Sequence, residues 1–253
     1  MRNIKLSISY DGSNYHGWQK QPGVATVQET LEHAIQKMVG HKINLVGSGR
    51  TDAGVHAICQ SANFFTNSGI PLHGFEKGLN SLLPPDISVL EAQDVPKDFH
   101  ARKNALAKSY MYRIVISDKR LPLIYRRAWI VRERLDLKDM TLAAKALKGR
   151  HDFSSFMAAG SSVRTTIRQI NHIEIRKTIC HEYLPFEIEE YQIRVKANGF
   201  LKYMVRNITG LLKEIGTGRL QWQMASRVLA ARDRTVAPAT APAYGLYLEQ
   251  VEY

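Results

Sequence analysis

The sequence predicts an α+β fold. Alternating apolar and polar residues indicate half-buried strands at many places along the 253 residues. Apolar residues at helical spacing occur in only a few segments, and strands follow one another in groups with little regular strand-helix alternation. A doubly wound parallel sheet requires that regular alternation, so it is the less favoured fold class.

The first half of the chain predicts a sheet with two helices. Apolar and polar residues alternate from Ile4 to Tyr10, which indicates a strand. Thr26 and Glu29 have the spacing of a capping box, and apolar residues then recur at helical spacing until Gly40, which predicts a helix. The other elements expected here are a short strand ending at Val46, a strand over 62–66, a helix over 74–83 and a strand over 87–95.

The second half repeats this pattern in part, after a break near residues 96–105. We therefore predict two related lobes, an N-terminal lobe at 1–100 and a C-terminal lobe at 101–253. The elements expected in the second lobe are strands over 108–116, 128–131, 167–176 and 191–197, helices over 137–147, 200–215 and 221–232, and a closing strand over 245–251.

The composition is that of an ordinary globular protein, with 44% hydrophobic and 23% charged residues. No run approaches the roughly 18 consecutive apolar residues that a membrane span needs, so we expect no membrane association. The N-terminus lacks the apolar core of a signal peptide. Cys59 and Cys180 are too few and too far apart for a disulfide framework, which predicts a cytoplasmic protein.

The charge balance predicts a polyanionic partner. Lysine and arginine total 35 against 23 aspartate and glutamate, a net charge of +12. Cationic side chains that displace condensed counterions gain the entropy of ion release, which favours nucleic-acid binding. The basic residues lie in several separated stretches with aromatic residues among them, and this favours nucleic acid over a membrane surface. The alternative is a charge that serves only solubility.

The segment 47–57 is the most informative part of the chain. It places Arg50 and Asp52 in a loop that contains Gly47, Gly49 and Gly54. In extended backbone, Arg50 and Asp52 would project from the same side, and the glycines would let a flat substrate approach closely. The loop matches neither the phosphate-binding loop, which requires Gly-Lys-Ser/Thr, nor the dinucleotide fingerprint, which requires a glycine at residue 52.

Asp52 is the leading catalytic candidate. A carboxylate beside an arginine in a basic protein stays ionised, and in that form it can act as a nucleophile or a base. The alternative is a structural role in which Asp52 caps a turn or pairs with Arg50.

Two further groups of residues fit nucleic-acid binding. Lys108, Tyr110 and Tyr112 share one face of a predicted strand, where aromatic rings can stack on unpaired bases. Lys202 and Arg206 are four residues apart near the start of the helix expected over 200–215, and two cations there can hold phosphates. The alternatives are a tyrosine strand that faces an ordinary core and a solvated helix edge.

Metal binding has little support in the sequence. His56 and Cys59 are three residues apart and can share a helical turn, but no second pair at ligand spacing completes a site of four ligands. The zinc-deaminase pattern is missing. We therefore expect no metal site.

Taken together, these segments resemble the TruA family of tRNA pseudouridine synthases, and the resemblance spans nearly the whole chain. The segment 49–57 is highly specific to it. The matching segments are 10–12 (Tyr-Asp-Gly), 17–19 (Gly-Trp-Gln), 26–28 (Thr-Val-Gln), 31–32 (Leu-Glu), 49–57 (Gly-Arg-Thr-Asp-Ala-Gly-Val-His-Ala), 99–102 (Phe-His-Ala-Arg), 110–112 (Tyr-Met-Tyr), 151–153 (His-Asp-Phe), 204–207 (Met-Val-Arg-Asn), 241–243 (Ala-Pro-Ala) and 245–248 (Gly-Leu-Tyr-Leu).

The resemblance implies an isomerase that converts uridine to pseudouridine at positions 38, 39 and 40 of the tRNA anticodon stem-loop. It implies a homodimer that needs neither a metal nor an organic cofactor. It also implies the pseudouridine synthase fold, in which two related α/β lobes with mainly antiparallel sheets join around a basic central cleft.

The resemblance assigns roles to individual residues. Asp52 is the expected nucleophile, and attack at C1′, addition to C6 and removal of the C2′ proton all stay open. Arg50 is expected to fill the space that a flipped base vacates and to pair with Asp52. Tyr110 is expected to stack on the flipped uracil, and its phenol is a candidate for removing the C5 proton.

The expected substrate contacts come from the second lobe. Arg206 would add an ion pair to Asp52 or hold a phosphate, Leu246 would form an apolar wall, and Lys202 and Asn207 would contact RNA. Two other functions are considered: a non-catalytic tRNA-binding or folding protein on the same scaffold, and the same isomerase acting on a different RNA uridine.

Overall fold

The computed structural model describes residues 1–161, 163–180 and 186–253. The chain divides into two compact units, Met1–Leu106 together with Tyr247–Tyr253, and Ala107–Leu246. In the part of the chain that is described, no helix is long and apolar enough to cross a membrane.

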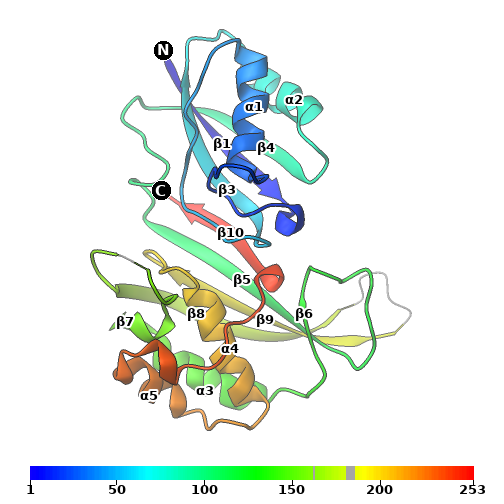
Figure 1. Cartoon of the computed structure of the whole chain (residues 1–253), viewed down its shortest axis with the longest axis vertical. Helices are drawn as coiled ribbons and strands as arrows, with labels where there is room; N and C mark the ends of the chain where they lie inside the picture. The colour runs from blue at the N-terminus through cyan, green and yellow to red at the C-terminus, as the bar shows by residue number, and fades with distance from the viewer. Residues whose placement is uncertain (162, 181–185) are drawn as a thin grey trace. The chain divides into compact units, whose positions relative to one another are not determined.

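The first unit is built on a sheet with the strand order β4-β1-β3-β10 (Figure 1). Strand β1 pairs antiparallel with both β3 and β4, and β10 pairs parallel with β3 through Tyr247 opposite His56 and Leu248 opposite Ala57. The strands are β1 (Arg2–Tyr10), β2 (Val46–Gly47), β3 (His56–Thr66), β4 (Ile87–Val95) and β10 (Leu246–Glu252), and β2 pairs with β3.

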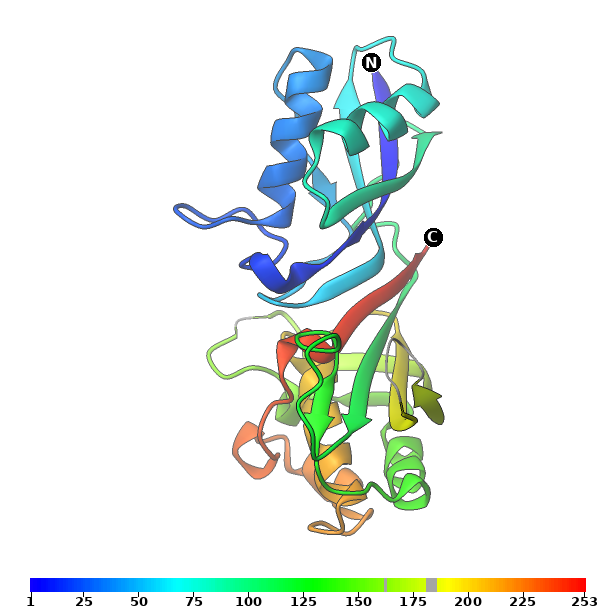
Figure 2. The same ribbon diagram turned by 90° about the vertical axis from the view of Figure 1, so that its right-hand side faces the viewer.

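Helices α1 (Val27–Val39) and α2 (Leu72–Leu82) complete the core of this unit. The alternation read from the sequence is confirmed on β1, where Ile4, Leu6 and Ile8 are fully buried. Helix α2 packs on β4 and contacts α1 (Figure 2). Helix α2 and strand β4 therefore cover each other's apolar residues, which removes their surface from water.

The start of α1 differs from the predicted capping box. Thr26 is the N-cap residue, but its side chain makes no capping hydrogen bond within the described chain. The hydroxyl of Thr30 instead donates to the Thr26 carbonyl oxygen, at 3.0 Å. The helix start is held mainly by backbone groups, because Val27 N donates to Gly17 O and Gln28 N donates to Trp18 O.

The second unit contains a sheet with the strand order β5-β9-β8-β7, and β6 pairs parallel with the other edge of β5. The pairs β5–β9, β8–β9 and β7–β8 are antiparallel. The strands are β5 (Ala107–Ile116), β6 (Trp129–Val131), β7 (Gly149–Asp152), β8 (Ile167–Cys180) and β9 (Ile188–Ala197).

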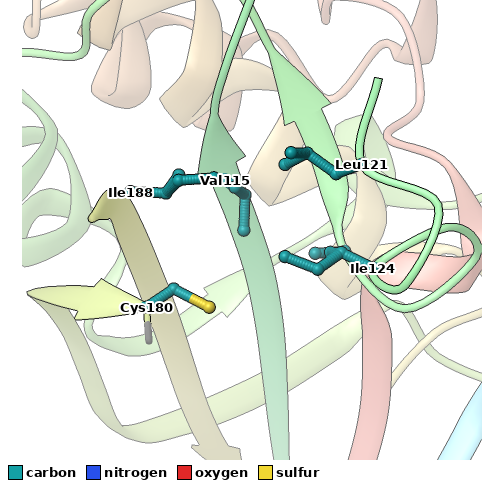
Figure 3. Packing of buried hydrophobic residues seen from close by; sticks show 6 residues of the cluster. Val115, Leu121, Ile124, Cys180 and Ile188 are labelled. Carbon is teal, nitrogen blue, oxygen red and sulfur yellow. The ribbon is translucent and has the colours of Figure 1, made fainter. Parts of the chain in front are cut away.

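Three helices pack in this unit: α3 (Leu137–Leu147), α4 (Met204–Gly216) and α5 (Met224–Ala231). Helix α3 contacts β8, α4 and α5. A small apolar cluster lies near the C-terminal end of β5 (Figure 3). It joins the loop before β6 to the last residue of β8 and the first residue of β9. Its buried members are Val115, Leu121, Ile124, Ala128, Cys180 and Ile188. Short 3₁₀ turns lie at Gly12–Asn14, Ser154–Phe156, Arg234–Val236 and Ala243–Gly245.

The α+β fold with mainly antiparallel pairing is confirmed. The predicted strand over 62–66 is longer than expected and begins at His56, and α4 begins at Met204, later than the residue 200 expected. The closing strand was expected with the second lobe, but residues Tyr247–Tyr253 belong to the first unit because β10 pairs with β3 there. The relation between the two lobes, and the basic cleft, stay predictions.

Candidate functional site

The loop 47–57 is fastened to β3 by its first residues. Ser48 N donates to Ser61 O at 2.8 Å, and the Ser48 hydroxyl donates to Gln60 Oε1 at 2.6 Å. Gln60 Nε2 then donates to Gly49 O at 3.1 Å. Ser48 and Gln60 are both fully buried, so these bonds are shielded from water and fix the backbone just before Arg50.

The middle of the loop is fastened to the segment that follows β1. Trp18 N donates to Thr51 O at 3.1 Å, and Gly54 N donates to Tyr15 O at 3.3 Å. The Tyr10 hydroxyl and Thr51 Oγ1 form a buried hydrogen bond of 2.8 Å. Burial of Tyr10 raises the pKa of its hydroxyl, which therefore stays protonated as a hydrogen-bonding group. Thr51 is thus held inward between its two neighbours in the sequence, Arg50 and Asp52.

Two glycines permit this close backbone packing. A Cβ at Gly12 would lie 2.0 Å from Val55 O, and a Cβ at Gly17 would lie 2.6 Å from Thr51 O. Gly17 also has a φ of +90°, a conformation that other residues rarely adopt. The loop therefore requires glycine at both positions.

Arg50 and Asp52 lie on either side of the anchored Thr51. Arg50 is exposed, and its Nε donates to Gln19 Oε1 at 3.1 Å. Asp52 is half-buried, and its backbone oxygen accepts from Val55 N at 3.1 Å in a tight turn. Asp52 is therefore partly accessible, and a reactive role is open to it.

His56 has a structural environment. Its Nδ1 accepts a hydrogen bond of 3.1 Å from Gly12 N, and its ring stacks on Tyr247 with centroids 4.7 Å apart. His56 and Cys59 lie on strand β3, so the helical turn considered for them is wrong. Across the described ranges, no group of three or more histidine, cysteine, aspartate or glutamate side chains has the arrangement of a metal site.

In the second unit, Tyr110 and Tyr112 lie two residues apart on strand β5, so they share one face of the strand, as predicted. Tyr110 packs edge-on against Phe200, with ring centroids 5.0 Å apart. The Tyr112 hydroxyl donates to Pro242 O at 2.8 Å, and burial raises its pKa well above the usual value. A Cβ at Gly245 would lie 2.6 Å from the Tyr112 ring, so the chain before β10 packs directly on this tyrosine.

Lys202 and Arg206 do not share a helix face, because α4 begins only at Met204. The predicted pair of helical cations is wrong in this respect. Both cations instead meet the ring of Tyr203: Arg206 Cζ lies 4.5 Å and Lys202 Nζ 5.3 Å from its centroid. Lys202 is exposed, and Arg206 is half-buried with its Nε donating to Ala241 O at 2.8 Å.

Asn207 and Leu246 are interior residues. The side chain of Asn207 is fully buried, and it donates to Phe156 O at 2.8 Å and accepts from Thr240 Oγ1 at 2.6 Å. A buried side chain used in this way is better placed to position its neighbours than to touch RNA directly. Leu246 is 6% exposed, at the first position of β10.

Sequence reasoning missed the supports of both regions. Tyr10, Ser48 and Gln60 fix the loop 47–57, and Tyr203 and Arg234 contact the surroundings of Arg206 and Asn207. No spacing rule selects these residues. Only Tyr10 lies in a segment that carried the family resemblance.

The chain is similar to known proteins over its full length. A family model described as tRNA pseudouridine synthase matches residues 6–102 and 143–253. A protein of Acetivibrio thermocellus named tRNA pseudouridine synthase A is 44% identical over 253 residues, which is all of both chains. Proteins with the same name from Geobacter sp. and Caldicellulosiruptor bescii are 46% and 44% identical, covering all of this chain and 99% and 100% of theirs.

Solved structures resemble the chain only weakly. A crystal structure of an unknown protein from Galdieria sulphuraria matches with 9% identity and a TM-score of 0.22, over 82% of this chain and 87% of that one. A match at this level does not bear on function.

Proposed function

Because the chain belongs to the tRNA pseudouridine synthase family, we propose that it isomerises uridine to pseudouridine in tRNA, at positions 38, 39 and 40 of the anticodon stem-loop. The observation that carries this proposal is the environment of Asp52. Asp52 is half-buried, two residues after the exposed Arg50, in a loop that hydrogen bonds anchor and that is made of the residues most specific to the family.

The reaction needs a nucleophile or base and no net change in atoms. The N1–C1′ bond of the uridine breaks, the uracil turns over, and a C5–C1′ bond forms while the C5 proton moves to nitrogen. No oxidant, reductant or energy source enters this balance. A carboxylate held at the sugar or the base can start the reaction by attack at C1′, addition to C6 or removal of the C2′ proton.

Asp52 is the proposed nucleophile, and Arg50 its neighbour in the loop. A uridine in or beside a stem must leave the stack before it can react, at a cost of a few kcal/mol. An exposed arginine is suited to fill the vacated space, because its planar guanidinium stacks on bases and binds phosphates. The anchoring of Thr51 holds the backbone at both residues, so little conformational entropy is lost when RNA binds.

The second unit supplies the remaining proposed roles. Tyr110 stacks on the flipped uracil, and its phenol is the proposed acceptor of the C5 proton. Arg206 acts as a cation toward Asp52 or a phosphate, Lys202 adds positive charge at the surface, and Leu246 forms an apolar wall. Asn207, which is buried, supports this group by fixing the chain around residue 240.

The charge and the family suggest the setting in which the protein works. A net charge of +12 suits a tRNA partner, and two cysteines without a disulfide framework suit the cytoplasm. We also propose a homodimer, on the family resemblance. A non-catalytic tRNA-binding protein on the same scaffold is the second candidate, and it would leave uridine unchanged on binding.

The proposed function is tested by mapping pseudouridine in tRNA transcripts after incubation with the purified chain. We expect new pseudouridine at positions 38–40 and at no other uridine, without added metal or cofactor. Pseudouridine found only at another position would mean that the enzyme acts on a different uridine. Binding without any modification would favour the non-catalytic candidate.

A further inference from the structure

Tyr203 has a backbone conformation that is unfavourable for a tyrosine. Its φ of +65° and ψ of +2° place it in the left-handed region, immediately before the first residue of α4. Helices are commonly started by residues in extended backbone whose side chains cap the helix, but the Tyr203 side chain makes no capping bond within the described chain. A non-glycine residue in this region carries strain that the surroundings must offset.

The ring of Tyr203 is placed against two cations. Arg206 Cζ lies 4.5 Å from the ring centroid, and Lys202 Nζ lies 5.3 Å from it. Both distances are within the range of a cation–π interaction, and arginine in particular stacks its planar group on aromatic faces. Arg206 lies three residues after Tyr203, in the first turn of α4. The ring of the residue before the helix therefore contacts a guanidinium in the first turn of that helix.

Arg206 is also held by hydrogen bonds to Ala241. Its Nε donates to Ala241 O at 2.8 Å, and Ala241 N donates to Arg206 O at 3.2 Å. The segment that contains Ala241 is itself anchored, because Arg234 donates to Pro238 O and Thr240 Oγ1, each at 3.0 Å. It also lies tightly on α4, where a Cβ at Gly210 would be 2.1 Å from Ala239 O.

We propose that Tyr203 is a positioning residue for Arg206. The ring and the Ala241 carbonyl both contact the guanidinium, so that one orientation is set before the substrate binds. This inference rests on the proposed function, in which Arg206 serves the isomerisation. Preorganised charge of this kind lowers the barrier of a reaction, because no reorganisation is needed when charge develops.

Because the backbone of Tyr203 is unfavourable for a tyrosine, one substitution can distinguish positioning of Arg206 from a contribution to the stability of the fold. Glycine adopts the left-handed region without strain, so Tyr203→Gly should keep the turn and hold or raise Tm. The same variant removes the ring. We expect kcat of Tyr203→Gly to fall about tenfold, with KM within about twofold of the parent. Tyr203→Phe keeps the ring and should stay within about twofold of the parent in kcat.

Two further arms assign the effect to Arg206. The Arg206→Lys variant lacks the planar guanidinium. Adding Tyr203→Gly to it should therefore lower the single-turnover rate by less than about twofold relative to Arg206→Lys alone. Arg232 is a second non-glycine residue in the left-handed region, with a φ of +52° and a side chain that is largely exposed. Arg232→Gly therefore controls for relief of backbone strain, with kcat unchanged.

Each outcome bears on the inference. An unchanged kcat in Tyr203→Gly, a rise in KM alone, or a full additional loss in the Arg206→Lys background would overturn it. Asp52→Ala and the parent chain run in the same assay keep the two proposals apart. A parent that forms no pseudouridine would reject the proposed function. An active parent whose kcat is unchanged in Tyr203→Gly would reject only the positioning role.

Discussion

Around Asp52, the proposed reactive residues are distinct from the residues that hold the loop in place. Gly12 and Gly17 let the segment after β1 approach the backbone of residues 51–55 without side-chain interference. Tyr10 then binds the loop through a buried hydrogen bond to Thr51, and Gln60 through a partly buried one to Gly49. A carboxylate on such a rigid loop can be held in reach of a substrate atom, which loop residues otherwise achieve poorly.

We predict that Gly12→Ala destabilises the protein and impairs isomerisation. The new Cβ would lie 2.0 Å from Val55 O, a backbone atom, so the loop must shift. We expect a loss of about 1–3 kcal/mol in the free energy of unfolding, measured by urea denaturation. Gly69→Ala is the matched control, because its Cβ meets no atom within 4 Å. Equal stability of the two variants would show that the close approach at Gly12 is not required.

At the scale of residues, the sequence selects candidates for the chemistry but not the residues that support them. Asp52, Arg50 and Tyr110 could be selected because their residue types suit nucleic-acid chemistry and because they lie in family motifs. Asn207 lay in a motif too, but the structure buries it, and its amide bonds to Phe156 O and Thr240. Burial of a single polar residue depends on long-range packing, which a local pattern does not contain.

Among the elements, the pair β5–β9 carries a buried ion pair. Arg113 on β5 donates to Glu190 on β9 through two bonds, Nε to Oε1 at 2.8 Å and Nη2 to Oε2 at 2.9 Å. The side chains are only 12% and 4% exposed. Burial alone would raise the pKa of Glu190, but the Arg113 guanidinium, together with hydrogen bonds from Gln192 and Cys180, outweighs it, so the pKa lies below the usual 4.5. This strand carries Tyr110 as well, so the pair fixes an element that holds a proposed site residue.

The pKa of Glu190 predicts acid sensitivity. Because the pKa is lower in the folded protein, its contribution to stability is present above about pH 4.5 and is lost as the pH falls through the folded value. Glu190→Gln leaves Arg113 buried without its charge partner, and we expect a loss of about 3 kcal/mol at pH 7. The difference from the parent should shrink below pH 4.5, as followed by urea denaturation across pH.

Glu189→Gln is the control for this experiment. Glu189 is the neighbouring carboxylate, and its partner Lys177 is on the surface, so solvent screens the pair and a smaller effect is expected. A gap between Glu190→Gln and the parent that stays constant from pH 7 to pH 3 would contradict the assigned ionisation.

Element types were predictable, whereas several boundaries were not. The alternation in 2–10 and the helical spacing in 137–147 are local signals, and both elements formed as expected. Helix α4 starts directly after Tyr203, whose left-handed backbone no local sequence pattern indicates. The place of the closing strand depends on pairing with β3, almost 200 residues earlier in the chain.

At the scale of the molecule, two units share one chain and, in our proposal, one reaction. The chain leaves the first unit after Leu106 and returns to it at Tyr247, so the second unit is an insertion between β4 and β10. The proposed residues are divided accordingly, with Arg50 and Asp52 in one unit and Tyr110 and Arg206 in the other. The net charge of +12 suits a polyanionic substrate.

The central claim is that the carboxylate of residue 52 performs the chemistry while the rest of the protein binds tRNA. Its most direct test compares Asp52→Ala with the parent, measuring pseudouridine formation and tRNA affinity on the same preparation. We predict that the variant forms no pseudouridine and binds tRNA within about tenfold of the parent, a difference of at most about 1.4 kcal/mol. Pseudouridine formation by the variant at the parental rate would contradict the account.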